Sequence, residues 1–170
     1  AHHACHIIKI FNKDGSFVRN IDMPTLGTVG FYAGVGSHPD DTEIYIPFMS
    51  FLQPISLYKY DFKDNSLTSI YRVEVPHFNP DNYETKQVFY QSKDGTTVPM
   101  FITAKKGLDL NGDNPTILYG YGGFGISLTP FYNSAFPVWL ERGGVYVVAN
   151  LRGGSEYGEK WHLAGMLENK

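Results

Sequence analysis

Six short runs of apolar, β-branched and aromatic residues succeed one another in the first 75 residues, and they limit what this chain can fold into. Each run has the length of a β-strand, and turn-forming stretches such as Asn12-Lys-Asp-Gly15 and Lys63-Asp-Asn65 separate them. The pattern therefore predicts antiparallel hairpins. The predicted strands cover residues 7–11, 17–21, 31–35, 43–49, 55–62 and 67–73.

The last four of these runs, from residue 31 to residue 73, predict one four-stranded meander of about the length of a propeller blade. In the run 55–62 the larger apolar residues fall at every second position over the first half, where Ile55 and Leu57 stand. Side chains two residues apart point to the same side of a strand. We therefore expect Ile55 and Leu57 to share the apolar face of this strand.

The pattern changes after residue 75, where the segment 76–81 combines two prolines with turn-prone polar residues. This linker predicts a domain boundary near residue 76, between a first domain of residues 1–75 and a second domain of residues 76–170. The elements of the second region predict the opening of an α/β sheet. They are a hairpin of strands 85–90 and 97–103, a strand at 116–119, a helix at 133–142 that ends at Gly143-Gly144, a buried strand at 145–149 and a helix within 158–170.

The stretch Thr116-Ile-Leu-Tyr-Gly-Tyr-Gly-Gly-Phe-Gly125 joins a short apolar run to a loop rich in glycine and aromatic residues. The run predicts a buried strand, and the glycines allow backbone amides and a tyrosine hydroxyl to face the space above its end. Such a loop can hold an oxyanion. The 170 residues contain no Gly-x-Ser-x-Gly turn, so the serine nucleophile that would use this loop is missing from them.

The composition narrows the range of partners. Fourteen Lys and Arg residues against 17 Asp and Glu residues give a net charge of -3 without a basic run, which argues against nucleic acid. No apolar run reaches bilayer-spanning length, and residues 1–6, which resemble a cut strand, lack a signal-peptide segment, so we expect no membrane association. The one cysteine, Cys5, excludes an intrachain disulfide and favours the cytoplasm, although a periplasmic protein would look the same.

Three segments of the second region carry a family resemblance. They are Tyr119-Gly-Tyr-Gly-Gly-Phe124, the apolar run 145–150, and Leu151-Arg-Gly-Gly-Ser-Glu-Tyr-Gly-Glu-Lys-Trp-His162. Together they resemble the start of the catalytic domain of the prolyl oligopeptidase family of serine peptidases, and residues 1–75 resemble the final blades of that family's seven-bladed β-propeller. The resemblance implies a mixed fold, in which the end of the propeller, made of antiparallel blades, is followed by the N-terminal part of an α/β-hydrolase domain.

The resemblance assigns roles to two aromatic residues of the loop. The family's oxyanion hole uses a tyrosine hydroxyl from this loop, and the matching residue is Tyr121. Spacing alone does not separate Tyr121 from Tyr119, which shares its face in an extended segment. Phe124 matches a phenylalanine that lines the family's hydrophobic proline-binding pocket, although from the sequence alone it could instead belong to the core.

Four further residues of these motifs are expected to be structural. Gly120, Gly122 and Gly123 would hold the loop open at positions where a β-carbon would clash. Arg152 would anchor the loop after the second apolar strand by bonding nearby carbonyls or carboxylates. None of the four is expected to take part in the chemistry.

Other residues that imitate a site are set aside. Ser155 does not form a nucleophile elbow, because the position two residues later is Tyr157 rather than glycine. His162 has no partner at metal-ligand spacing, so we expect it to make a structural hydrogen bond within a helix. Four possible metal ligands near the start would alternate along a strand and point to opposite sides. These are His2, His3, Cys5 and His6. We expect neither a metal nor a cofactor.

The function implied by the resemblance is hydrolysis of short peptides on the carboxyl side of proline by a monomeric serine peptidase. The serine, aspartate and histidine of its triad would lie beyond Lys170, so the chain alone would be an inactive fragment. Two alternatives stay open: a relative within the family that is specific for basic residues, and a non-enzymatic protein that presents its sheets to a partner. A sheet without its later strands would expose an edge and an apolar face, which predicts poor solubility.

Overall fold

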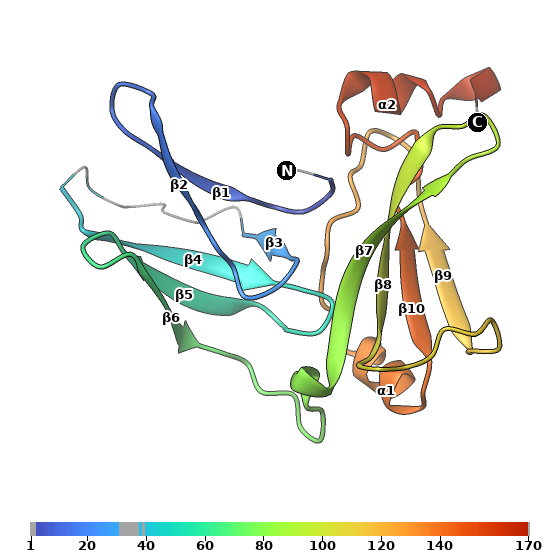
Figure 1. Cartoon of the computed structure of the whole chain (residues 1–170), viewed down its shortest axis with the longest axis horizontal. Helices are drawn as coiled ribbons and strands as arrows, with labels where there is room; N and C mark the ends of the chain where they lie inside the picture. Colours follow the sequence, from blue (N-terminus) through green and yellow to red (C-terminus); the bar gives the residue numbers. More distant parts are fainter. Residues whose placement is uncertain (1–2, 31–37, 39, 170) are drawn as a thin grey trace.

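The computed structural model describes residues 3–30, 38 and 40–169, and it shows two lobes joined along one side (Figure 1). The first lobe contains a two-stranded ribbon and a four-stranded antiparallel sheet, and the second contains a mixed four-stranded sheet with two short helices at its ends. The change of pattern in the sequence near residue 75 thus corresponds to a change of architecture, from paired hairpins to a sheet that includes a parallel pair.

The ribbon consists of β1 (Ile8–Phe11) and β2 (Phe17–Ile21), which pair antiparallel as the sequence predicted. The turn between them is closed by a backbone hydrogen bond of 2.9 Å from Asn12 N–H to the carbonyl of Ser16. Gly15 takes a φ of 85° in this turn, a conformation that glycine adopts at little cost.

The four-stranded sheet is a meander in which each strand pairs with the next along the chain. Its strands are β3 (Thr28–Val29), β4 (Glu43–Met49), β5 (Ser56–Asp61) and β6 (Ser66–Tyr71). The predicted strand at 31–35 lies outside the described residues, and among those that are described the meander begins with β3. The other three strands and their antiparallel order are confirmed.

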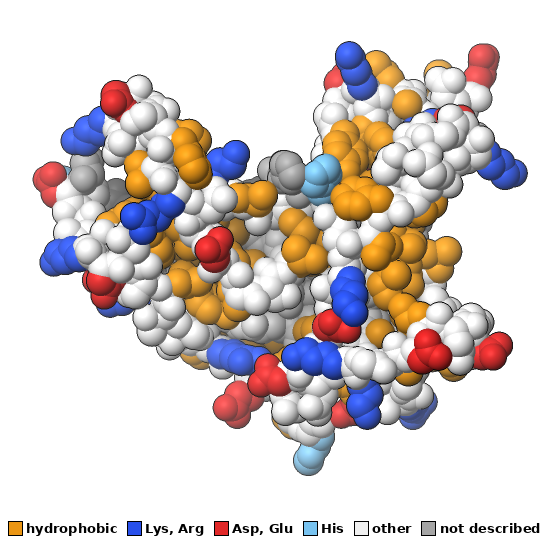
Figure 2. Space-filling view, viewed as in Figure 1, with side chains coloured by type: hydrophobic (Ala, Val, Ile, Leu, Met, Phe, Trp, Pro, Cys, Tyr) orange, Lys and Arg blue, Asp and Glu red, His pale blue; other side chains and the backbone are white. Residues whose placement is uncertain are grey.

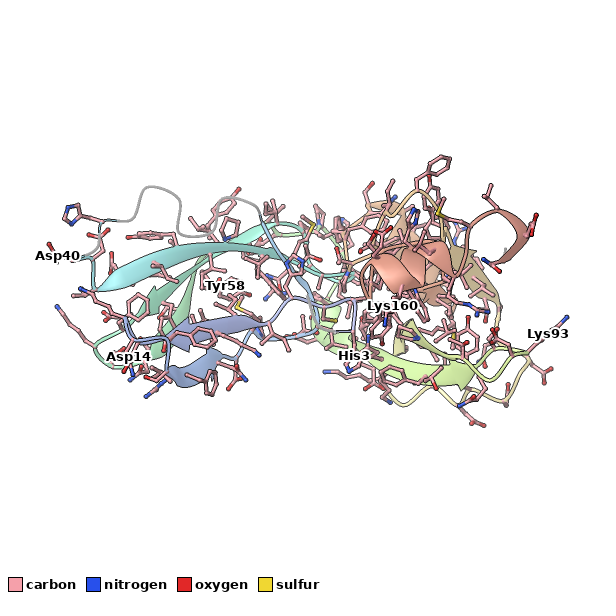
Figure 3. The ribbon with its side chains drawn as sticks, turned by 90° about the horizontal axis from the view of Figure 1, so that it is seen from above. His3, Asp14, Asp40, Tyr58, Lys93 and Lys160 are labelled. Carbon is pink, nitrogen blue, oxygen red and sulfur yellow. The ribbon has the colours of Figure 1, made fainter. Side chains whose placement is uncertain are left out.

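The face of β5 that is buried is the opposite of the predicted one. Tyr58 and Tyr60 point into the core, whereas Ile55 is 52% exposed, so the prediction from Ile55 and Leu57 was wrong. The reason is that the tyrosine rings bring more apolar area than the aliphatic pair. The ring of Tyr58 packs edge-on to that of Phe48 at 6.0 Å, between the ribbon and the sheet (Figure 3). The buried cluster is Ile21, Ile46, Phe48, Tyr58 and Tyr60.

The first described residues begin in a turn, which corrects the expectation of a cut strand at residues 3 and 4, whereas residues 1 and 2 lie outside the described part of the chain. His3 and Ala4 have φ values of 48° and 63° in a turn. This turn lets Ala4 and Cys5 enter the core of the second lobe, because a straight strand would carry them past it. His3 is held there by hydrogen bonds to Gln87 through its carbonyl and to Tyr157 through its ring. Figure 3 shows His3 where the lobes meet.

The second lobe is built on the sheet order β7-β8-β10-β9. A short 3₁₀ turn, η1 (Pro80–Asn82), leads into β7 (Tyr83–Gln91), which forms a long hairpin with β8 (Thr97–Lys105). Strand β10 (Val145–Ala149) pairs antiparallel with β8 and parallel with β9 (Thr116–Gly120). The predicted hairpin and both later strands are therefore confirmed.

Two short helices lie at opposite ends of this sheet (Figure 1). Helix α1 (Ala135–Glu141) ends before Gly143, whose φ of 80° fits the predicted glycine stop. Helix α2 (Glu159–Leu163) and the turn η2 (Leu167–Asn169) cover the carboxyl ends of β9 and β10. In the part of the chain that the structure describes, none of the helices has the length and hydrophobicity needed to cross a bilayer.

Strand β9 contradicts the prediction of a buried strand. All five of its residues are exposed, and Leu118 reaches 67%, whereas all five residues of β10 are buried as predicted. The physical reason is position: β9 is the last strand of the sheet and pairs on one side only, with β10. An apolar run thus identified the strand correctly but not its place in the sheet.

Candidate active site

The glycine-rich loop, taken as residues 121–128 after β9, lies at the carboxyl ends of the two parallel strands, β9 and β10 (Figure 1). Open α/β sheets bind their ligands at this end, because the loops after neighbouring parallel strands diverge there and leave a crevice. The glycine-rich loop and the Arg-Gly-Gly loop are the two segments that the parallel pairing brings together. The sequence motifs quoted above therefore meet at one place.

An open hollow of about 750 Å³ lies beside the glycine-rich loop. Residues 121–124 line one side of it, and Gly153, His162 and Met166 contribute to the other. Its lining is mainly apolar. Separately from this lining, Figure 2 shows hydrophobic side chains on the visible face of the second lobe. A surface of this shape and character can take an apolar group of modest size.

Tyr121 and Phe124 both border this hollow. Their ring centres are 6.4 Å apart with a tilt of 35°. Tyr121 is 42% exposed and Phe124 is 87% exposed, so Phe124 does not pack in the core of this chain. Phe124 also has a φ of 53°, an uncommon value for a bulky residue that often marks a functional loop. The structure thus brings the two predicted aromatic residues together.

The three loop glycines differ in what their surroundings demand. At Gly120 an added β-carbon would lie 2.9 Å from the end of the Leu151 side chain, which would have to move, and Gly122 has a φ of 57° that favours glycine. At Gly123 an added β-carbon would make only an ordinary contact of 3.8 Å with the Tyr121 ring. The expected clash is therefore wrong for Gly123, since a contact at this distance is not strained.

Arg152 binds the turn of the β7–β8 hairpin. Its guanidinium forms an ion pair with Asp94 and donates hydrogen bonds to Thr96 Oγ1 at 3.2 Å and Ser92 Oγ at 3.4 Å. The amide of Thr96 and the Arg152 guanidinium lower the pKa of Asp94 to about 2. The carboxylate contact is of the kind expected for an anchoring residue.

The loop after β10 is held to α2 through Gly153. The carbonyl of Gly153 accepts a hydrogen bond of 2.7 Å from His162 Nδ1, so this nitrogen carries the proton. The same carbonyl accepts the amide of Gly125 at 3.0 Å, which attaches the glycine-rich loop. His162 thus makes the structural hydrogen bond that we expected of it.

The residues that imitated a metal site do not form one in the described part of the chain. Among residues 3–30, 38 and 40–169, no three His, Cys, Asp or Glu side chains are placed to share an ion. His6 Nδ1 accepts the amide of Val29 at 3.0 Å, and burial raises the pKa of the Cys5 thiol to about 11. A buried thiol with so high a pKa is a poor nucleophile at neutral pH.

Sequence reasoning missed two polar residues of the site, Asn150 and Glu156. Both are buried, and both make hydrogen bonds to the backbone of Leu128 in the glycine-rich loop. The available signal was Asn150 itself, a polar residue directly after a continuous apolar strand. No pattern in the sequence pointed to Leu128 as its partner.

Two family models match the chain. The N-terminal β-propeller domain of prolyl oligopeptidase matches residues 1–72, and the prolyl oligopeptidase family peptidase matches residues 130–170. The chain belongs to the prolyl oligopeptidase family. It contains the end of the family's propeller domain followed by the start of its peptidase domain, and the glycine-rich loop lies between the two matched stretches.

Relatives in this family cover almost the whole chain. The prolyl endopeptidase of Elizabethkingia miricola is 45% identical over 96% of the chain and 23% of the relative, and that of Dictyostelium discoideum is 37% identical over 99% and 22%. The chain therefore spans about a quarter of the length of the family members that it matches.

Solved structures of the family agree with the fold. A structure from an analysis of two prolyl endopeptidases aligns with a TM-score of 0.86 at 39% identity, over 99% of this chain and 24% of that one. Prolyl oligopeptidase B from Galerina marginata, bound to a 35mer hydrolysis and macrocyclization substrate, aligns with a TM-score of 0.84 at 30% identity, over 98% and 24%.

Proposed function

We propose that the full-length protein is a serine peptidase that hydrolyses short peptides on the carboxyl side of proline. The observation that carries the proposal is the placement of Tyr121 and Phe124 on one hollow at the carboxyl ends of β9 and β10. The relatives named prolyl endopeptidase support both the reaction and the specificity. The triad serine, aspartate and histidine would come from residues outside these 170.

In the proposed reaction the serine attacks the scissile carbonyl while the histidine takes its proton and the aspartate orients the histidine. The carbonyl oxygen then becomes negatively charged, and the Tyr121 hydroxyl donates a hydrogen bond to it. Donors that are held in place before the reaction contribute about 2.7 to 4 kcal/mol to the stability of such a transition state. The exposed ring of Tyr121, at the rim of the hollow, is available for this contact.

Phe124 would form one wall of the pocket for the proline ring. A proline ring needs a dry and flat-sided slot, and an aromatic side chain supplies one at a small cost in conformational entropy. None of the described residues that line the hollow is Asp or Glu. This lining favours proline over the basic residues of the alternative specificity, because a basic side chain would need a carboxylate partner.

The remaining proposals concern the whole protein. We place the boundary between propeller and peptidase domains near residue 76, in the segment between β6 and η1. The propeller would restrict access to short peptides, the protein would act as a monomer, and its single cysteine favours the cytoplasm.

The exchange Tyr121→Phe in the full-length protein tests the proposal, with Tyr119→Phe as the matched control. Hydrolysis of a proline-containing reporter peptide should show a loss of roughly 100- to 1000-fold in kcat for Tyr121→Phe, with KM changed little. Tyr119→Phe removes a hydroxyl two residues away and should retain kcat. Equal losses in both variants would exclude the assigned role, and absence of turnover in the wild type would favour the non-enzymatic alternative.

A further inference from the structure

Leu128, in the glycine-rich loop, has both of its backbone polar groups bound by buried side chains. Its amide donates a hydrogen bond of 3.0 Å to Glu156 Oε1, and its carbonyl accepts one of 2.7 Å from Asn150 Nδ2. Asn150 Nδ2 also lies 3.3 Å from Glu156 Oε1, so the two side chains are connected to each other. We call this arrangement the Leu128 clamp.

The clamp is buried and includes a carboxylate. Asn150 is fully buried and Glu156 is 8% exposed, and within the described part of the chain no Lys, Arg or His forms an ion pair with Glu156. Burying a carboxylate without a cation is costly. The hydrogen bonds to Oε1 offset part of this cost, whereas Glu156 Oε2 and Asn150 Oδ1 are buried without a hydrogen-bond partner among the described residues. An added β-carbon at Gly154 would collide with Glu156 Oε2, which shows that the backbone itself makes room for this side chain.

The clamp lies on the same loop as Tyr121. Between Tyr121 and Leu128, the Gly125 amide bonds to the Gly153 carbonyl at 3.0 Å. The glycine-rich loop is therefore attached at two points to the segment that follows β10. Tyr121 itself is exposed, so these attachments must supply order that core packing does not give it.

We propose that Asn150 and Glu156 are positioning residues, which fix Leu128 and thereby hold the Tyr121 hydroxyl where the oxyanion forms. The inference rests on the proposed function, because it deepens the role given to Tyr121. A displacement of about 1 Å in a catalytic group can cost roughly 100-fold in rate. Glu156 acts through Oε1 as an acceptor, and its negative charge is not required.

This reasoning separates the variants of Glu156. Glu156→Ala removes the acceptor and should lower kcat of the full-length protein by roughly 10- to 100-fold, with KM changed less than about 3-fold. Glu156→Gln keeps Oε1 and should retain kcat within about 3-fold. Asn150→Ala should resemble Glu156→Ala, and the double variant should lose less than the product of the two single losses, because both side chains hold one residue.

The matched control is Thr103→Val. Thr103 is 1% exposed, and its hydroxyl lies 2.9 Å from that of Thr85 on the neighbouring strand. Its replacement removes a buried hydrogen bond from the same sheet without touching the glycine-rich loop. It should lower the melting temperature while kcat stays unchanged, which distinguishes positioning from general loss of stability.

Hydrogen exchange at the Leu128 amide gives a second readout that does not depend on turnover. Exchange should be at least about 10-fold faster in Glu156→Ala than in wild type, but not in Glu156→Gln or Thr103→Val. Unchanged exchange in Glu156→Ala would overturn the clamp. If Tyr121→Phe inactivates the enzyme but Glu156→Ala combines faster exchange with unchanged kcat, the positioning role is overturned. A Glu156→Gln variant that is as impaired as Glu156→Ala would overturn it as well. If the wild type does not hydrolyse proline peptides, the proposed function fails, whereas exchange still decides the clamp.

Discussion

Strands β9 and β10 are neighbours that are both largely apolar but have opposite surroundings. They pair in parallel from Thr116 opposite Val145 to Gly120 opposite Ala149, yet every residue of β10 is buried and every residue of β9 is exposed. Strand β10 has a partner on each side, and α1 covers it through the Phe136 ring, 4.2 Å from that of Tyr146. The comparison teaches that the position of an apolar strand in the sheet, more than its composition, decides its burial.

The loops that follow the two strands also differ in the burial of their side chains. The loop after β10 carries buried side chains that bind backbone groups, among them Asn150 and Glu156. The loop after β9 carries the exposed rings of Tyr121 and Phe124. One loop is a support and the other presents the groups to which we assign chemistry, so substitutions in the two should affect different properties.

The largest difference in unfolding free energy is expected between the variants Val148→Asp in β10 and Leu118→Asp in β9. Val148 is 2% exposed, so an uncompensated charge there should cost about 3 to 5 kcal/mol, a large part of the stability of a domain. Leu118 is 67% exposed, and the same change should cost less than about 0.5 kcal/mol. Chemical denaturation of the 170-residue chain, followed by circular dichroism, measures both losses. Similar losses in the two variants would show that β9 is buried in solution.

A smaller loss of stability is expected for the exchange Gly153→Ala, at the point where the two loops are in contact. Gly153 has a φ of 101°, and an added β-carbon would collide with the carbonyl of Gly122. Backbone strain and displacement of the glycine-rich loop should together cost Gly153→Ala about 3 kcal/mol. Gly143 has a φ of 80°, and an added β-carbon would meet nothing within 4 Å, so Gly143→Ala should cost only about 1 kcal/mol. Equal unfolding free energies for the two alanine variants would contradict the contact between the loops.

The ion pair of Arg152 and Asp94 should give a modest effect that depends on pH. Folding lowers the pKa of Asp94 from its ordinary 3.8 to about 2, so the unfolded chain binds the proton more readily. The stabilisation is therefore complete above the ordinary pKa and is lost as the pH falls toward 2. Melting temperatures of wild type and Asp94→Asn should differ at pH 6 and converge near pH 2. A difference that is independent of pH would show that the charge of Asp94 does not matter.

The smallest effect on stability is expected for Leu118→Lys, which should instead change self-association. An exposed apolar edge strand can pair with another chain, and a lysine on the edge opposes this. Sedimentation of the 170-residue chain should show less oligomer for Leu118→Lys than for wild type, with an equal unfolding free energy. A wild-type chain that is monomeric and melts cooperatively would contradict the predicted poor solubility.

The sequence predicted the bounds of the strands more accurately than it predicted what packs against them. The bounds of β2, β4 and β10 agree with the predicted runs, because turn residues mark the ends of each strand. The errors concern which side of β5 is buried, the burial of β9 and the course of residues 3–5. Each of these depends on what packs against the segment from a distant part of the chain, and a local pattern contains no information about that.

The candidate site was predicted in part. The motif from Tyr119 to Phe124 indicated which residues gather at the hollow, and the structure brings Tyr121 and Phe124 together there. Their roles in catalysis stay predictions. The Leu128 clamp was not predictable, because its side chains bind a backbone amide and a backbone carbonyl, and the residue that carries these groups can be of almost any type.

The burial of Ala4 and Cys5 has a consequence for the order of folding. These residues pack with Phe101, Phe136 and Tyr146, which follow them by roughly a hundred residues or more along the chain. During synthesis Ala4 and Cys5 therefore leave the ribosome before the residues that pack against them in the second lobe. Contacts between such distant residues slow folding, so we infer that closure of this joint is a late step and that neither lobe reaches its final packing alone.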